Sequence, residues 1–144
     1  SLSGRPLKNR QAEPDEGNHE SMERPYKLNH CFPMLFVPDV TEAQNFYRDR
    51  LGFDVVPAWN YGEPPIYGGV MLDGTIFHFA EGEPEPKGVH ILVYVKGISA
   101  YYDVLQRTNV EIESELESHD YGETQFTIKD LNGYTICFTE STDS

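Results

Sequence analysis

The sequence predicts an α+β domain made of two βαβββ modules, which form a curled half-barrel sheet with the helices on its outer face. Two observations predict this fold. Residues 73–81 (DGTIFHFAE) and residues 132–140 (NGYTICFTE) repeat nearly the same pattern, one near the end of each half. The segments that precede them also follow one order, strand, helix and further strands. Such a repeat is typical of pseudo-symmetric folds, in which the functional cleft lies between the copies.

The first half opens with an apolar run, CFPMLFV at 31–37, which predicts a buried strand. Residues 39–53 predict a helix, because apolar side chains recur at helical spacing between Val40 and Leu51. Thr41 with Glu42 provides capping chemistry at its start, and Gly52 ends it.

Three further strands complete this half. Residues 53–59 predict a strand at an edge or a bulge, since Pro57 cannot donate to a central ladder. Asp73-Gly74 lies between two alternating stretches and predicts a hairpin turn. The two strands of that hairpin are predicted at 66–72 and 75–81, and the Pro/Gly-rich residues 82–88 form a linker.

The second half repeats the order. Its predicted helix spans 97–109, and its predicted strands span 89–95, 110–117, 123–129 and 134–140. The last two strands are joined through DLNG, a longer connection than the Asp73-Gly74 turn. Alignment of the halves places Phe32 with His90, and His78 with Cys137.

Length and composition indicate one globular domain. The chain has 144 residues, 38% of them apolar. Residues 1–29 form a predicted polar tail, and 30–144 the domain, with modules at about 30–81 and 89–140. The net charge of −13 argues against nucleic-acid binding and permits a cationic ligand. Two cysteines favour a reducing cytoplasm, and the sequence has no apolar run of membrane-spanning length.

Alternation along the strands predicts a cavity. In the strand at 89–95, His90 and Tyr94 share one face, while aliphatic residues on the other suit packing under a helix. The inward faces are smaller or more polar than the core faces, which predicts a concave small-molecule pocket with an aromatic wall. The predicted ligand-binding residues are Phe32, Met34, Phe36, Trp59, Tyr61, Tyr67, His78, His90, Tyr94 and Cys137.

Several motifs resemble the glyoxalase/bleomycin resistance/dioxygenase superfamily, also called vicinal oxygen chelate proteins. The resemblance rests on MLFVPDVTEAQNFYRDRLGFDVV at 34–56 and DLNGYTICFTE at 130–140, and it covers about residues 32–140. It implies paired βαβββ modules. It also implies that catalytic relatives hold a divalent metal through inward-facing residues on the first and last strand of each half.

The matching positions here are Phe32, His78, His90 and Cys137. Phe32 cannot bind metal, and Cys137 replaces the carboxylate that the resemblance leads us to expect. We therefore expect a metal-independent, bleomycin-resistance-like protein that binds a small molecule, aromatic or cationic, and needs no cofactor. We expect a homodimer as well, because half-barrels leave exposed edges and related chains complete their sites by pairing.

Two alternatives stay open. One is a metal-dependent lyase, isomerase or dioxygenase in which His78, His90 and Cys137 hold a divalent ion such as zinc. The other is a regulatory or structural dimer whose cavity is filled by its own side chains.

Overall fold

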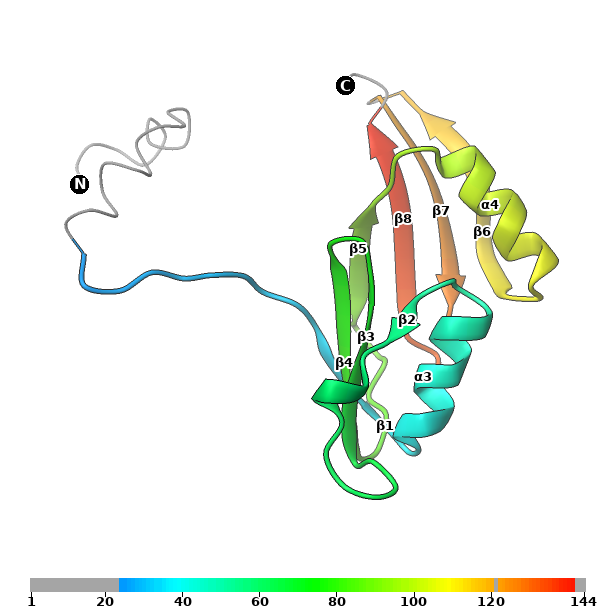
Figure 1. The fold of residues 1–144 in the computed structure, drawn as a ribbon. Helices are drawn as coiled ribbons and strands as arrows, with labels where there is room; N and C mark the ends of the chain where they lie inside the picture. The colour runs from blue at the N-terminus through cyan, green and yellow to red at the C-terminus, as the bar shows by residue number, and fades with distance from the viewer. Residues whose placement is uncertain (1–23, 121, 142–144) are drawn as a thin grey trace. The chain divides into compact units, whose positions relative to one another are not determined.

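The computed structural model describes residues 24–120 and 122–141 (Figure 1). The predicted tail at 1–29 therefore lies mostly outside the described residues. Residues 24–31 are exposed and contain no helix or strand. A compact unit begins at Phe32 and carries the fold.

The compact unit consists of two βαβββ modules, as the repeat predicts. The first contains β1 (Met34–Val37), α3 (Val40–Asp49), β2 (Asp54–Val55), the 3-10 helix η1 (Pro57–Trp59), β3 (Tyr67–Leu72) and β4 (Thr75–Glu81). The second contains β5 (His90–Tyr94), α4 (Ile98–Arg107), β6 (Glu111–His119), β7 (Glu123–Lys129) and β8 (Thr135–Ser141).

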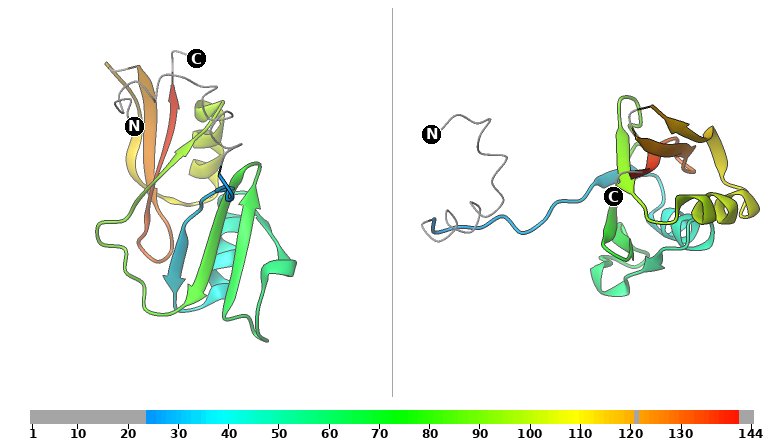
Figure 2. Two further views of the ribbon diagram at one scale, coloured as in Figure 1. Left: turned by 90° about the vertical axis from the view of Figure 1, so that its left-hand side faces the viewer. Right: turned by 90° about the horizontal axis from the view of Figure 1, so that it is seen from above.

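Each module folds into one four-stranded sheet of the same topology. The strand orders are β1-β4-β3-β2 and β5-β8-β7-β6, so the first and last strands of each module pair in parallel. Met34 pairs with His78 in the first sheet, and Leu92 pairs with Cys137 in the second. The aligned positions of the two halves thus have the same register, which confirms the predicted repeat. α3 packs on the first sheet and α4 on the second (Figure 2).

Three boundaries in the first module differ from the sequence prediction. The strand predicted at 31–37 begins only at Met34 and is buried on one face, because Met34 and Phe36 point away from the helix side. Asp39 is the N-cap of α3 in place of the predicted Thr41 with Glu42, since its carboxylate accepts the Glu42 N–H at 3.0 Å. The strand predicted at 53–59 is only two residues long, because Pro57 starts η1 instead.

The core lies between each sheet and its helix. Tyr47 of α3 is fully buried, and its ring lies 5.1 Å from both Phe77 and Phe79 of β4, measured between centroids. In the second module Phe126 and Phe138 stack at 5.2 Å under α4. The alternation along β4 and β8 therefore predicted the core-facing side chains correctly.

Asp130 joins the two modules at the DLNG connection. Its Oδ1 accepts the backbone N–H groups of Asn132 and Tyr134, which shapes the turn. Its Oδ2 accepts the Tyr47 hydroxyl at 2.7 Å. The Tyr134 hydroxyl in turn donates to the Phe36 carbonyl of the first module. Burial raises the pKa of Asp130, although these hydrogen bonds favour its charged form.

Candidate functional site

An aromatic cage surrounds His78 on the face of the first sheet that is turned away from α3. The rings of Phe32, Trp59 and Tyr67 lie 4.4, 4.9 and 5.4 Å from the His78 imidazole, measured between centroids. These four side chains, which we call the His78 cage, come from β4, β3, η1 and the residue that opens the compact unit. The structure thus brings together four of the ten predicted site residues.

Glycines in β3 make room for this cage. A Cβ at Gly69 would lie 2.8 Å from Cε3 of Trp59 and 2.9 Å from Cδ2 of His78. Gly69 pairs with His78 in the sheet, so β3 carries no side chain at the point where the Trp59 and His78 rings meet. Gly68 has a close neighbour of its own on the opposite face, where a Cβ would lie 2.5 Å from the amide nitrogen of Gln44. Two successive glycines therefore serve two faces of one strand.

The His78 imidazole has one hydrogen-bonded nitrogen and one nitrogen without a partner among the described residues. Burial lowers the pKa of His78 below its ordinary value. Nδ1 shares a hydrogen bond with the Tyr67 hydroxyl at 2.7 Å. Nε2 is buried and has no hydrogen-bond partner among the described residues. When Tyr67 donates its proton to Nδ1, Nε2 carries a proton and is a donor, and in the other tautomer it is an acceptor.

Apolar side chains extend from the cage along β1. Met34 and Phe36 are each 43% exposed, and Phe36 covers Gly82, where a Cβ would lie 2.9 Å from the Phe36 ring. Tyr61 is 71% exposed and joins the cage only through a backbone bridge to Tyr67. Exposed apolar groups in such a row are typical of a surface that contacts a ligand or another chain.

The remaining three predicted residues lie on the second sheet. His90 and Tyr94 are exposed on the edge strand β5, and Cys137 is half-buried on the neighbouring β8. His90 pairs with Thr135, two residue pairs along the strands from the Leu92–Cys137 pair. This face is more polar than the His78 cage, since the Lys129 amine bonds to the Thr135 hydroxyl and lies 3.6 Å from a carboxylate oxygen of Glu113.

The donor set does not fit the metal centre that catalytic relatives would require. In residues 24–120 and 122–141, no three His, Cys, Asp or Glu side chains are gathered as a metal site. The alternative trio of His78, His90 and Cys137 is therefore not assembled within one chain. Phe32, at the first ligand position, has no donor atom and instead packs on His78.

The sequence did not predict a role for some residues of β3 that lie beside the His78 cage. Gly69 is one, and Met71, which pairs with Ile76 next along the same face, is another. The Gly68-Gly69 pair inside an otherwise apolar strand was the available signal, because an interior glycine often marks a close approach of other groups.

The described residues include no helix that is both long and apolar enough to span a bilayer. No match was found among curated protein sequences. Solved structures with the same fold include a glyoxalase-related enzyme from Clostridium phytofermentans, with a TM-score of 0.69 and 21% identity over 83% of this chain and 99% of that one. TioX from Micromonospora sp. ML1 has a TM-score of 0.68 and 16% identity, covering 78% of this chain and 99% of that chain.

A superfamily member from Sphaerobacter thermophilus DSM 20745 has a TM-score of 0.65 and 19% identity, covering 79% of this chain and 98% of that chain. At these identities the likeness concerns the fold alone. The family model for the Glyoxalase/Bleomycin resistance protein/Dioxygenase superfamily matches residues 27–138, most of the chain. With its two βαβββ modules, the chain belongs to the Glyoxalase/Bleomycin resistance protein/Dioxygenase superfamily.

Proposed function

We propose that this protein binds a small aromatic molecule at the His78 cage without the help of a metal ion, in the manner of a bleomycin-resistance-like protein. The observation that carries the proposal is the buried Nε2 of His78, which has no partner among the described residues and is surrounded by three aromatic rings. A buried polar atom without a partner is costly, and a ligand group that bonds to it removes that cost.

The cage favours a flat ligand that carries one hydrogen-bonding group. The rings of Phe32 and Trp59 offer faces on which a planar molecule can stack, and Met34 and Phe36 extend the apolar surface. The single polar contact at His78 would set the orientation of the ligand. The net charge of −13 adds a general attraction for cationic ligands.

A homodimer would complete this site. The outward faces of β1 and β5 carry exposed apolar side chains, among them Leu92 at 55% and Tyr94 at 64% exposure. Both strands are edge strands, so their outer backbone groups are available for contacts as well. We propose that a second chain covers these faces, and that the protein acts in the cytoplasm with Cys31 and Cys137 as free thiols. A monomeric mass by light scattering at micromolar concentration would contradict the dimer.

The single tryptophan of the chain makes the proposal directly measurable. Because Trp59 lies in the cage, its one indole N–H resonance reports on ligand binding there. We expect 2-naphthol to shift this resonance saturably, and decahydro-2-naphthol, its saturated counterpart, to bind about tenfold more weakly, because stacking on two rings contributes about 1–2 kcal/mol.

Two variants separate the cage from general hydrophobic binding. Phe32→Leu removes a stacking face and should weaken 2-naphthol binding several-fold. Tyr26→Leu removes an exposed aromatic ring outside the compact unit and should leave binding unchanged. Equal affinities for the aromatic and saturated alcohols, or equal effects of the two variants, would refute the proposed site.

The metal-dependent alternative is decided by elemental analysis of the purified protein. One stoichiometric divalent metal, lost in the His90→Ala variant, would overturn the metal-independent proposal. Binding of 2-naphthol that is unchanged by a chelator supports it.

A further inference from the structure

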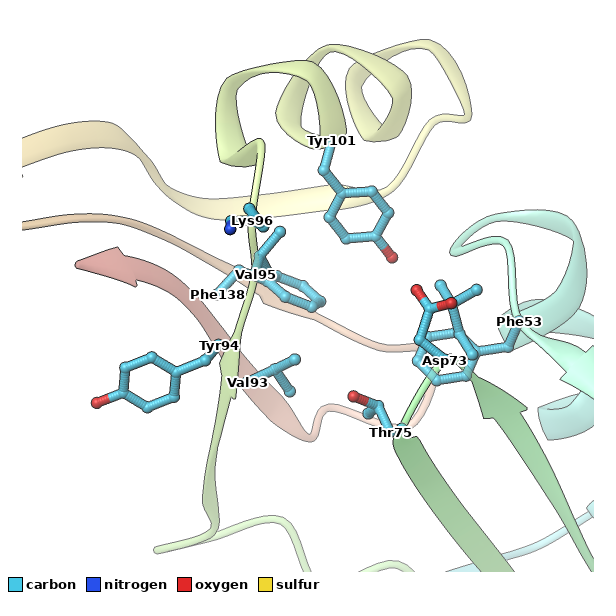
Figure 3. A pocket seen from close by; sticks show the side chains of 11 residues that line it. Phe53, Asp73, Thr75, Val93, Tyr94, Val95, Lys96, Tyr101 and Phe138 are labelled. Atoms are coloured by element: carbon cyan, nitrogen blue, oxygen red, sulfur yellow. The ribbon is translucent and has the colours of Figure 1, made fainter. Parts of the chain in front are cut away.

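A cavity lies at the junction of the two modules, away from the His78 cage. It has a volume of about 480 Å³, within the range of small-molecule pockets, and it opens between the β3–β4 turn and the segment that joins β5 to α4 (Figure 3). None of its lining residues belongs to the His78 cage.

The walls of this cavity are apolar and come from both modules. Phe53 and Leu72 form the wall on the first module. Val93, Val95 and Phe138 form the wall on the second. These side chains pack against the core, so the walls are held by the two sheets.

Asp73 provides a negative charge at the mouth. Its carboxylate has no hydrogen bond or ion pair among the described residues, and in Figure 3 it is directed toward the cavity, as is the Thr75 hydroxyl. Lys96 also lines the cavity, but Figure 3 shows its amine directed away. The Lys96 charge acts on Glu140 instead, where it contributes to lowering the pKa of that carboxyl after the backbone hydrogen bonds from α4.

The turn does not require this charge. Asp73 has a φ of 54°, a left-handed conformation that asparagine adopts as readily as aspartate. The carboxylate is therefore available for another role, and the Thr75 side chain lines the same cavity.

We propose that this cavity is a second binding site, for an amphipathic ammonium ion whose apolar body fills the space between the modules and whose ammonium group lies at Asp73. This inference does not depend on the proposed function of the His78 cage. It assigns a different class of ligand to a different part of the fold.

The test is an NMR titration of the ¹⁵N-labelled full chain with 2-phenylethylammonium. We expect saturable shifts in the backbone N–H groups of residues 73–75 and 93–96, and none in the Trp59 indole. The neutral 2-phenylethanol should bind about fivefold more weakly, as expected for the loss of one exposed ion pair, and the anionic 3-phenylpropanoate should not bind. Shifts confined to Trp59, or no saturable shift, would overturn the proposal.

Variants then assign the effect to Asp73. Asp73→Asn should weaken binding of 2-phenylethylammonium about fivefold and leave binding of 2-phenylethanol unaffected. Glu83→Gln removes a charge outside the cavity and should change the affinity for 2-phenylethylammonium less than twofold. Thr75→Val should also weaken binding of 2-phenylethylammonium, by a smaller factor than Asp73→Asn. His78→Gln should leave this binding intact even if it abolishes binding of 2-naphthol. Equal effects of Asp73→Asn and Glu83→Gln would show attraction by the overall charge and reject the site.

Discussion

Replacing Tyr47 by Phe tests the hydrogen bond that joins the two modules. The change removes only the hydroxyl, so the ring can keep its contacts with Phe77 and Phe79. Oδ2 of Asp130 then loses its partner at 2.7 Å in a buried site, while Oδ1 keeps two backbone donors. Hydrogen bonds to charged groups contribute about 1.5–3 kcal/mol, so we expect the free energy of unfolding to fall by about 2 kcal/mol.

The loss depends on pH in a direction that follows from the Asp130 pKa. Burial raises this pKa above its value in the unfolded chain, so the folded protein binds the proton more readily, and stability falls as pH rises through that window. Removing the Tyr47 hydroxyl raises the Asp130 pKa further. The difference between wild type and variant should therefore be largest at neutral pH. It should shrink as the pH falls through the raised pKa of Asp130, where this group becomes protonated in both proteins.

Urea unfolding at pH 7 and at pH 4 measures both effects. Tyr102→Phe is the matched control, because the Tyr102 hydroxyl has no hydrogen bond among the described residues. A double-mutant cycle with Asp130→Asn isolates the pair. A loss below about 0.5 kcal/mol for Tyr47→Phe, or strict additivity in the cycle, would refute the reasoning.

Three further predictions concern the cage and α4. Gly69→Ala should lower the free energy of unfolding by about 1–3 kcal/mol and shift Trp59 fluorescence, because the added Cβ would overlap Trp59 and His78. Gly74→Ala is the control and should have little effect, because a Cβ at Gly74 would have no neighbouring atom within 4 Å. Glu140→Gln should speed amide exchange in the first turn of α4, since its carboxylate accepts two backbone N–H groups there. Those bonds lower the Glu140 pKa, so this stabilisation is present above pH 4.5 and is lost in acid. Burial lowers the His78 pKa, so the unfolded chain binds more protons than the folded protein, and we expect wild-type stability to fall below about pH 6.5. His78→Gln should abolish this fall in stability. Equal pH profiles of stability for the wild type and the variant would contradict this.

The fold could be predicted further than the site because alternation along a strand reports burial directly. The spacing of Phe77 and Phe79 in residues 75–81 predicts that both face the core, and both are buried. The capping role of Asp39 was missed, because Thr41 and Asp39 carry similar chemistry and only the backbone conformation distinguishes them.

The candidate site could be predicted less completely, because it depends on contacts between residues that are far apart in the sequence. Trp59 reaches His78 through a 3-10 turn whose geometry no periodicity encodes. The partner of Nδ1, the Tyr67 hydroxyl, depends on strand register as well as on residue type. Asp73 was recognised only as a turn residue, because its position on the cavity between the modules depends on how the two sheets pack.

The helix ends show that neither half of this duplicated chain is self-sufficient. Just beyond α3, the carbonyls of Arg50 and Leu51 accept hydrogen bonds from the hydroxyls of Thr108 and Tyr101, respectively, in the other half. The Arg50 guanidinium in turn donates a hydrogen bond to the Asn109 carbonyl. Cutting the chain between the copies would leave these groups without their partners. The two halves should consequently melt as one cooperative unit.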